Sequence, residues 1–124
     1  MSTWTIHSGD VTGGSHKDKL VGCHITTNTA NTAYEFTDNN INTVLATTTG
    51  TSLPTPPFTF PSFSLGGQNF TIEVTTLTGG NSSNQAQGNW SIPSPTAEPD
   101  GTWTAQAGAT TDVEGEDTKS ASAR

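Results

Sequence analysis

The sequence predicts a single all-β domain, a small antiparallel sandwich or jelly-roll-like barrel of about seven or eight short strands with little or no helix. Thr, which is β-branched and favours strands, supplies 25 of the 124 residues. No window repeats apolar residues at helical spacing. The stretch Pro57–Leu77 holds two apolar runs on either side of a Gly-Gly pair, which is typical of a β-hairpin.

Four strands are predicted in the N-terminal half. Trp4 shares a face with Ile6 in the first of them, and Tyr34 shares a face with Phe36 in the third, as period-2 alternation requires. Turns rich in Gly, Asn and Asp separate the runs, and Gly50–Pro57 is predicted to cross in an extended conformation because of its prolines. The four runs are Thr3–His7, Lys19–Thr27, Thr32–Asp38 and Ile41–Thr49.

The hairpin within Pro57–Leu77 carries the largest apolar side chains. With the two residues after Gly66 as its turn, Phe58 is expected opposite Leu77, on the face away from the inner apolar pairs. Both strands would then switch their apolar face near Pro61. This second face would need a cover, either the Pro-rich crossing or a neighbouring subunit. Because proline has no N–H, the first strand is expected at a sheet edge or with a bulge.

The C-terminal part is predicted to contain a second hairpin, Asn89–Ser94 with Gly101–Gly108. Residues 1–108 form one predicted β domain, and 109–124 form a polar acidic tail. The tail contains four of the eleven acidic residues of the chain, namely Asp112, Glu114, Glu116 and Asp117.

Charge limits the classes of partner. The net charge is −7 and the chain has four Lys and Arg residues in total, so no basic patch is available for nucleic acid or for an anionic membrane. No apolar run approaches the ~20 residues of a spanning helix. The N-terminus shows no ordinary secretory signal. Localisation therefore stays open, with a virion or an extracellular surface favoured.

Potential metal ligands and nucleophiles gather near the N-terminus, but their spacing matches no zinc signature. Cys23 and His24 are adjacent on a predicted strand and would point to opposite faces, so they could not readily share one metal. We expect no metal, no cofactor and no catalytic residue here, with Cys23 a small core residue. The residues concerned are His7, Asp10, His16, Asp18, Cys23 and His24.

The sequence evidence for other catalytic or metal-binding sites is weaker. Glu35 and Glu73 lie mid-strand and could face a groove as paired carboxylates, although such residues more often form the solvated side of a sheet. Loop oxygen ligands around Asp38 could bind calcium, but no EF-hand pattern occurs. The sequence therefore predicts a protein that is not an enzyme.

The favoured function is a self-assembling structural subunit, such as a capsid decoration, tail or surface filament protein. Leu, Ile, Val and Phe together number only 20 of 124 residues, and contacts with copies of itself or with a scaffold or capsid protein would add buried surface. The terminal segments Met1–His7 and Ala109–Arg124 are expected to reach neighbouring subunits by strand addition. The expected self-association residues are Trp4, Ile6, Phe58 and Leu77.

The alternative is a carbohydrate-binding module with a glycan as partner. Trp90, Trp103 and Tyr34 could present aromatic faces to sugars, with Asn and Thr supplying hydrogen bonds. In a chain with so few aliphatic residues, the same Trp side chains could instead close the ends of a thin core.

Overall fold

The computed structural model describes residues 3–14, 16–38, 43–77, 85–94 and 98–107. This part of the chain contains β-strands, one short 3₁₀ helix and no α-helix, which confirms the predicted all-β class. The elements are β1 (Thr3–Val11), η1 (Lys17–Leu20), β2 (His24–Thr27), β3 (Tyr34–Thr37), β4 (Val44–Thr47), β5 (Phe58–Thr59), β6 (Phe63–Leu65), β7 (Gln68–Leu77), β8 (Gln85–Ser94) and β9 (Glu98–Ala107).

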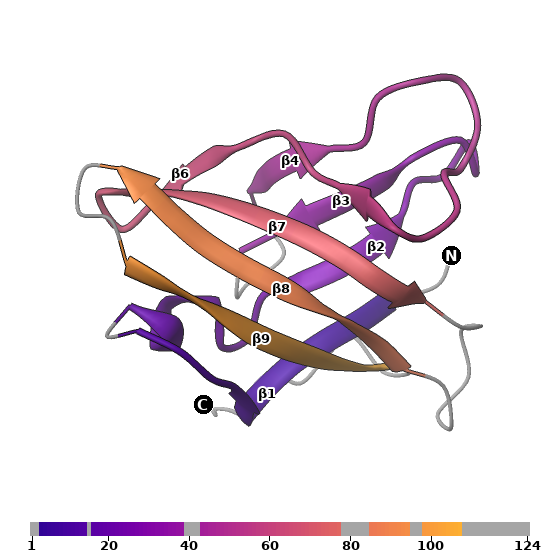
Figure 1. The fold of residues 1–124 in the computed structure, drawn as a ribbon. Helices are drawn as coiled ribbons and strands as arrows, with labels where there is room; N and C mark the ends of the chain where they lie inside the picture. The colour runs from indigo at the N-terminus through magenta and orange to yellow at the C-terminus, as the bar shows by residue number, and fades with distance from the viewer. Residues whose placement is uncertain (1–2, 15, 39–42, 78–84, 95–97, 108–124) are drawn as a thin grey trace.

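All of these strands belong to one antiparallel sheet. Its order is β4-β3-β2-β1-β9-β8-β7-β5, and β6 also pairs with β7. The sheet curls into a half-barrel in which β7, β8 and β9 run side by side in front of β1 to β4 (Figure 1). Pairing of β1 with β9 joins the two halves. The sheet is therefore continuous, and three of its strands are ten residues long rather than short.

The two ends of the sheet meet at a seam. β4 contacts β6, yet the backbone ladder of the sheet does not join them. Aromatic rings fill the space instead. The ring of Phe36 lies 5.2 Å from that of Phe63 and 5.6 Å from that of Phe60, and Tyr34 stacks on Phe58 at 5.5 Å. Aromatic side chains thus pack between the two ends of the sheet on its inner side, and in the described residues no backbone ladder joins the two edge strands.

The core lies inside the curl and is built from alternate residues of every long strand. Apart from Pro93, outward-facing positions on β7, β8 and β9 are Thr, Asn, Ser, Gln and Glu, which produces the period-2 pattern of a sheet with one face exposed to solvent. The largest fully buried apolar side chains are Trp90, Trp103, Phe36, Phe60, Phe70, Ile6, Leu20, Ile25, Ile72 and Ile92.

The turn of the β6–β7 hairpin lies one residue earlier than predicted. Phe63 pairs with Phe70, so the turn residues are Gly66 and Gly67. Their φ angles are 60° and 83°, and two successive positive φ values define a type I′ turn, whose twist suits a hairpin. The predicted register was therefore wrong, because it gave only one of the two glycines a turn position.

The predicted switch of apolar face does not occur. Phe58 pairs with Val74, not with Leu77. The strand breaks around Pro61, and the register with β7 slips by one residue between β5 and β6. That slip keeps both Phe58 and Phe63 directed to the core. The expectation of an edge position or a bulge at Pro61 is confirmed, since β5 ends the sheet.

The second predicted strand is shorter than expected. Lys17–Leu20 forms η1, and β2 begins only at His24. Gly22 has a φ of 87° between them, a conformation that favours glycine and turns the chain into the sheet. The predicted alternation through Val21 was wrong for this reason, although Cys23 and Ile25 are both buried.

Candidate functional site

The four expected self-association residues lie in the core of the monomer. Trp4 and Ile6 are 3% and 0% exposed, and Phe58 and Leu77 are partly buried against the same cluster. β1 lies between β2 and β9 in the sheet, so Thr3–His7 is an interior strand and not an arm. A neighbouring copy would have to contact other residues, because this strand already pairs on both sides.

The expected sugar-stacking residues are enclosed as well. Trp90 and Trp103 are each 1% exposed. The indole N–H of Trp90 donates to the Thr12 carbonyl at 2.8 Å, and that of Trp103 donates to the Asn89 carbonyl at 3.1 Å. Tyr34 is half-buried and stacks on Phe58. The two indoles complete the core, and their faces are not free to stack on a ligand, whereas Tyr34 has one ring face occupied by Phe58.

Each of the two indoles lies over a glycine on the neighbouring strand. Gly88 pairs with Trp103, and Gly101 pairs with Trp90. A methyl group on Gly88 would lie 2.7 Å from the Trp103 ring, and one on Gly101 would collide with the indole Nε1 of Trp90. The sequences GNW and GTW, at the same offset on antiparallel strands, therefore create two reciprocal Gly–Trp pairs.

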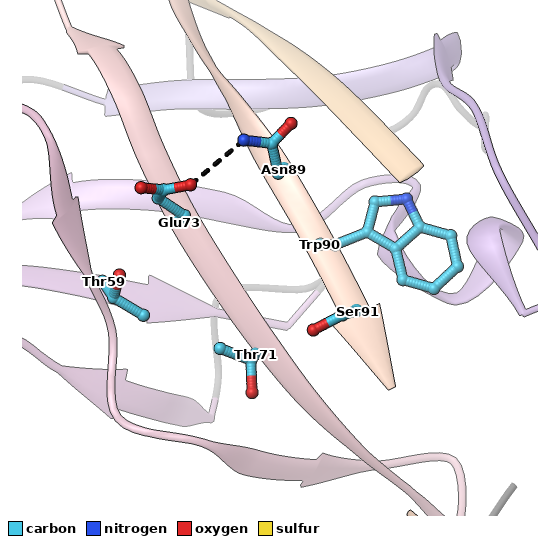
Figure 2. A pocket seen from close by; sticks show the side chains of 6 residues that line it. All are labelled: Thr59, Thr71, Glu73, Asn89, Trp90 and Ser91. Carbon is cyan, nitrogen blue, oxygen red and sulfur yellow. Dashed lines mark hydrogen bonds between the residues drawn. The ribbon is translucent and has the colours of Figure 1, made fainter. Parts of the chain in front are cut away.

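A polar hollow lies on the opposite face of the same strands. It measures about 280 Å³ and is open to solvent over β5, β7 and β8 (Figure 2). The indole of Trp90 is turned away from it, so the strand backbone separates this hollow from the core. The lining residues are Thr59, Thr71, Glu73, Asn89, Trp90 and Ser91.

Glu73 and Asn89 form the centre of the hollow. They are register partners on β7 and β8, and Asn89 Nδ2 donates to Glu73 Oε1 at 3.1 Å. Asn89 is exposed and Glu73 is half-exposed. Within the described part of the chain, this bond leaves Glu73 Oε2 and Asn89 Oδ1 available as acceptors. The pair can therefore accept hydrogen bonds from a ligand without giving up its own bond.

These residues belong to a row that crosses four strands. Thr59 pairs with Glu73, Glu73 with Asn89, and Asn89 with Thr102. At the far end the hydroxyl groups of Thr102 and Thr12 lie 2.7 Å apart. Sequence reasoning singled out only Glu73 from this row. The signal that could have revealed the others is the strict alternation of polar and apolar residues along three strands.

The candidate metal ligands near the N-terminus do not gather at one point: among the residues that the structure describes, no three His, Cys, Asp or Glu side chains converge. Cys23 is fully buried, and its Sγ lies 3.7 Å from the Lys19 carbonyl. Burial, with the charge of Asp38 as a smaller cause, raises the pKa of its thiol. His24 is buried and its Nδ1 lies 2.9 Å from Thr5 Oγ1.

The carboxyl group of Asp10, on β1, has a shifted pKa. Desolvation raises the pKa of its carboxyl group above the ordinary value, and interactions with His7 and Gln106 only partly offset that. A carboxyl group with a raised folded-state pKa lowers stability while it is ionised, and the loss is relieved as the pH falls through that pKa.

Asp10→Asn is therefore expected to raise the melting temperature at pH 7. The difference from the wild type should shrink as the pH falls through the raised folded-state pKa and should be nearly gone by about pH 3, below the ordinary value of 3.8, where the wild-type carboxyl group is protonated in both states. Calorimetry of both proteins between pH 3 and pH 7 measures this. A difference that stays constant over the range would show that the Asp10 charge is not its cause.

The two carboxylates considered for catalysis lie far apart in the strand order. Glu35 is on β3 and Glu73 on β7, with β2, β1, β9 and β8 between those strands in the sheet. In the residues described, no helix is long and apolar enough to cross a membrane. No protein-family model, curated protein or solved structure matches this chain.

Proposed function

We propose that this chain is a non-enzymatic structural subunit that associates with copies of itself, or with a scaffold or capsid protein, in a virion-type or extracellular assembly. The observation that supports this most directly is the seam between β4 and β6, where the sheet ends without closing its hydrogen-bond ladder. Unpaired strand edges are the usual sites at which a second chain adds a strand.

β4 presents backbone groups away from its partner strand. The N–H of Thr48 donates to the Tyr34 carbonyl at 3.0 Å. Since pairing groups alternate along an antiparallel strand, the backbone N–H and C=O of Thr47 then point away from β3. β4 also lacks the Lys or Pro residues that commonly protect an edge.

Val44 makes the same strand apolar toward solvent. It is 49% exposed and is the one large hydrophobic residue classed as exposed within the described ranges. Leu45 beside it is partly buried against the core. A neighbouring strand on β4 would cover Val44 and would add apolar burial to a core that is small for the length of the chain.

Only one of the two terminal segments that the sequence suggested for association keeps that role in this proposal. Thr3–His7 is part of β1, which pairs with a strand on each side, so this segment cannot extend to a neighbouring subunit. Ala109–Arg124 lies outside the described residues, and its expected contact with neighbours remains a proposal. The β4 edge takes the place of the residues that the sequence suggested for association.

Val44→Lys is the test. The wild-type chain is expected to form oligomers at micromolar concentration. The variant is expected to weaken association by at least about tenfold, because the contact loses the burial of one Val side chain and gains a charge. Light scattering after size-exclusion chromatography measures both. Since the chain carries −7, added salt should strengthen association of the wild type.

Thr76→Lys is the matched control, since Thr76 is an exposed strand residue on β7. It adds the same charge away from the β4 edge, and we expect it to leave association unchanged. A wild-type protein that remains a folded monomer up to high concentration would contradict the proposed function. An equal effect of both lysines would contradict the role of β4.

A further inference from the structure

We infer that the outer face of β5, β7, β8 and β9 binds a neutral oligosaccharide that lies across the strands, with Glu73 and Asn89 at the centre of its site. This site is distinct from the β4 edge and does not depend on assembly. It also differs from the Trp-based platform that the sequence suggested, because it lies on the opposite face of β8 from the Trp90 indole (Figure 2).

The chemistry of the hollow matches a ligand with many hydroxyl groups. Carboxylate and amide oxygens at Glu73 and Asn89 accept hydrogen bonds, while the hydroxyl groups of Thr59 and Ser91 can donate or accept. Sugar hydroxyl groups likewise act as both donors and acceptors. An ionised acceptor such as Glu73 makes stronger hydrogen bonds than a neutral one.

The register gives the site its length and direction. Thr59, Glu73, Asn89 and Thr102 face outward at one level of four neighbouring strands. Neighbouring strands lie about 4.8 Å apart, so the row extends about 14 Å across the sheet. That length suits several linked sugar units rather than one. Thr71 and Ser91 form a second, shorter row beside it.

Hydrogen bonds within the protein hold several of these side chains in place. Asn89 is fixed on Glu73 at 3.1 Å, Thr102 on Thr12 at 2.7 Å, and Thr71 on Ser62 at 3.0 Å. A long β-sheet lies underneath. Side chains that are already ordered lose less conformational entropy on binding, which favours affinity on an open surface.

The same face argues against other classes of ligand. The described row carries a single charge, which is negative, so phosphate-bearing ligands gain nothing from it. A peptide would need apolar anchor pockets, and the exposed large hydrophobic residue of the described chain, Val44, lies on β4 instead. A neutral polyhydroxyl chain requires neither basic residues nor an apolar pocket.

The experiment begins with the full chain on an array of neutral oligosaccharides. The oligosaccharide retained most strongly is then titrated into ¹⁵N-labelled protein. We expect saturable shifts of the amide resonances of Thr59, Glu73, Asn89 and Thr102. We also expect Glu73→Ala to weaken binding by about tenfold or more, because it removes an ionised acceptor.

Glu35→Ala is the matched control, since Glu35 is a half-exposed mid-strand glutamate on β3. It should leave affinity unchanged. The inference is overturned if no neutral oligosaccharide is retained, if the shifts fall outside this face, or if both alanine variants bind equally. The wild-type shift map decides the location even where a variant folds poorly. The array signal, the amide shifts and the affinities of the two variants can all be measured on a monomer, so a failure of self-association would not affect them.

Discussion

Gly88→Ala is expected to destabilise the domain by about 3 kcal/mol or more, enough to unfold much of a marginally stable protein. A β-carbon on Gly88 would collide with the carbonyl oxygen of Glu73, which is backbone and cannot rotate away. It would also meet the Trp103 ring at 2.7 Å. The variant must therefore separate β7 from β8 or displace a buried indole. Urea unfolding followed by tryptophan fluorescence measures the loss.

Gly67→Ala is the comparison for this prediction. It makes the same chemical change at a hairpin turn where an added β-carbon meets nothing within 4 Å. Its φ of 83° imposes a cost of about 1–2 kcal/mol for any residue with a side chain. If Gly88→Ala proved no more harmful than Gly67→Ala, the close approach of β7 to Gly88 would be wrong.

Trp90→Ala is the second large effect, with an expected loss of about 3–5 kcal/mol. The Trp90 ring is 1% exposed and packs on Phe70 at 5.8 Å, so its removal leaves a cavity in the core. It also leaves the Thr12 carbonyl without the indole N–H that it accepts at 2.8 Å. The free energy of unfolding from urea titration is again the readout.

Trp90→Phe separates these two contributions. Phenylalanine keeps an aromatic ring but has no N–H, so a loss of about 1–3 kcal/mol is expected from the unpaired carbonyl and the smaller ring. If Trp90→Phe cost as much as Trp90→Ala, the hydrogen bond rather than ring volume would dominate. If neither changed stability, Trp90 would not be a core residue.

Local sequence signals were sufficient for the fold class. The abundance of Thr, the alternation in Tyr34–Thr37 and the absence of helical periodicity all predicted an antiparallel β protein, and the structure agrees. The two hairpins that the sequence predicted, β6 with β7 and β8 with β9, are also present. These features depend on near neighbours in the sequence, which is why they could be predicted.

The register of the β6–β7 hairpin and the side of the sheet on which Phe58 lies could not be predicted in the same way. Two glycines in succession permit alternative turns, and a shift of one residue changes every facing pair. The slip around Pro61 then brings Phe58 back to the core, where it stacks on Tyr34. That contact joins distant parts of the chain, so no local pattern indicated it.

In the candidate site, too, some features follow from local sequence and others only from the pairing of the strands. Alternation along β7 assigns Thr71 and Glu73 to the side opposite Ile72, and alternation along β8 assigns Asn89 to the side opposite Trp90. From these positions the sequence singled out only Glu73. The sequence did not determine that Thr59, Glu73, Asn89 and Thr102 would align, because β5, β7, β8 and β9 align only after both hairpins have taken their register.

By itself, the sequence determined the strand-rich class, the net negative charge and the apolar side of those strands that alternate without a break, such as Tyr34–Thr37. Only the tertiary structure decided which apolar residues are covered. It placed Trp4 and Ile6 in an interior strand through the pairing of β1 with β9. It buried Trp90 and Trp103 against Gly101 and Gly88. The physical reason is that alternation assigns a side chain to a face, whereas burial depends on which strands later lie beside that face.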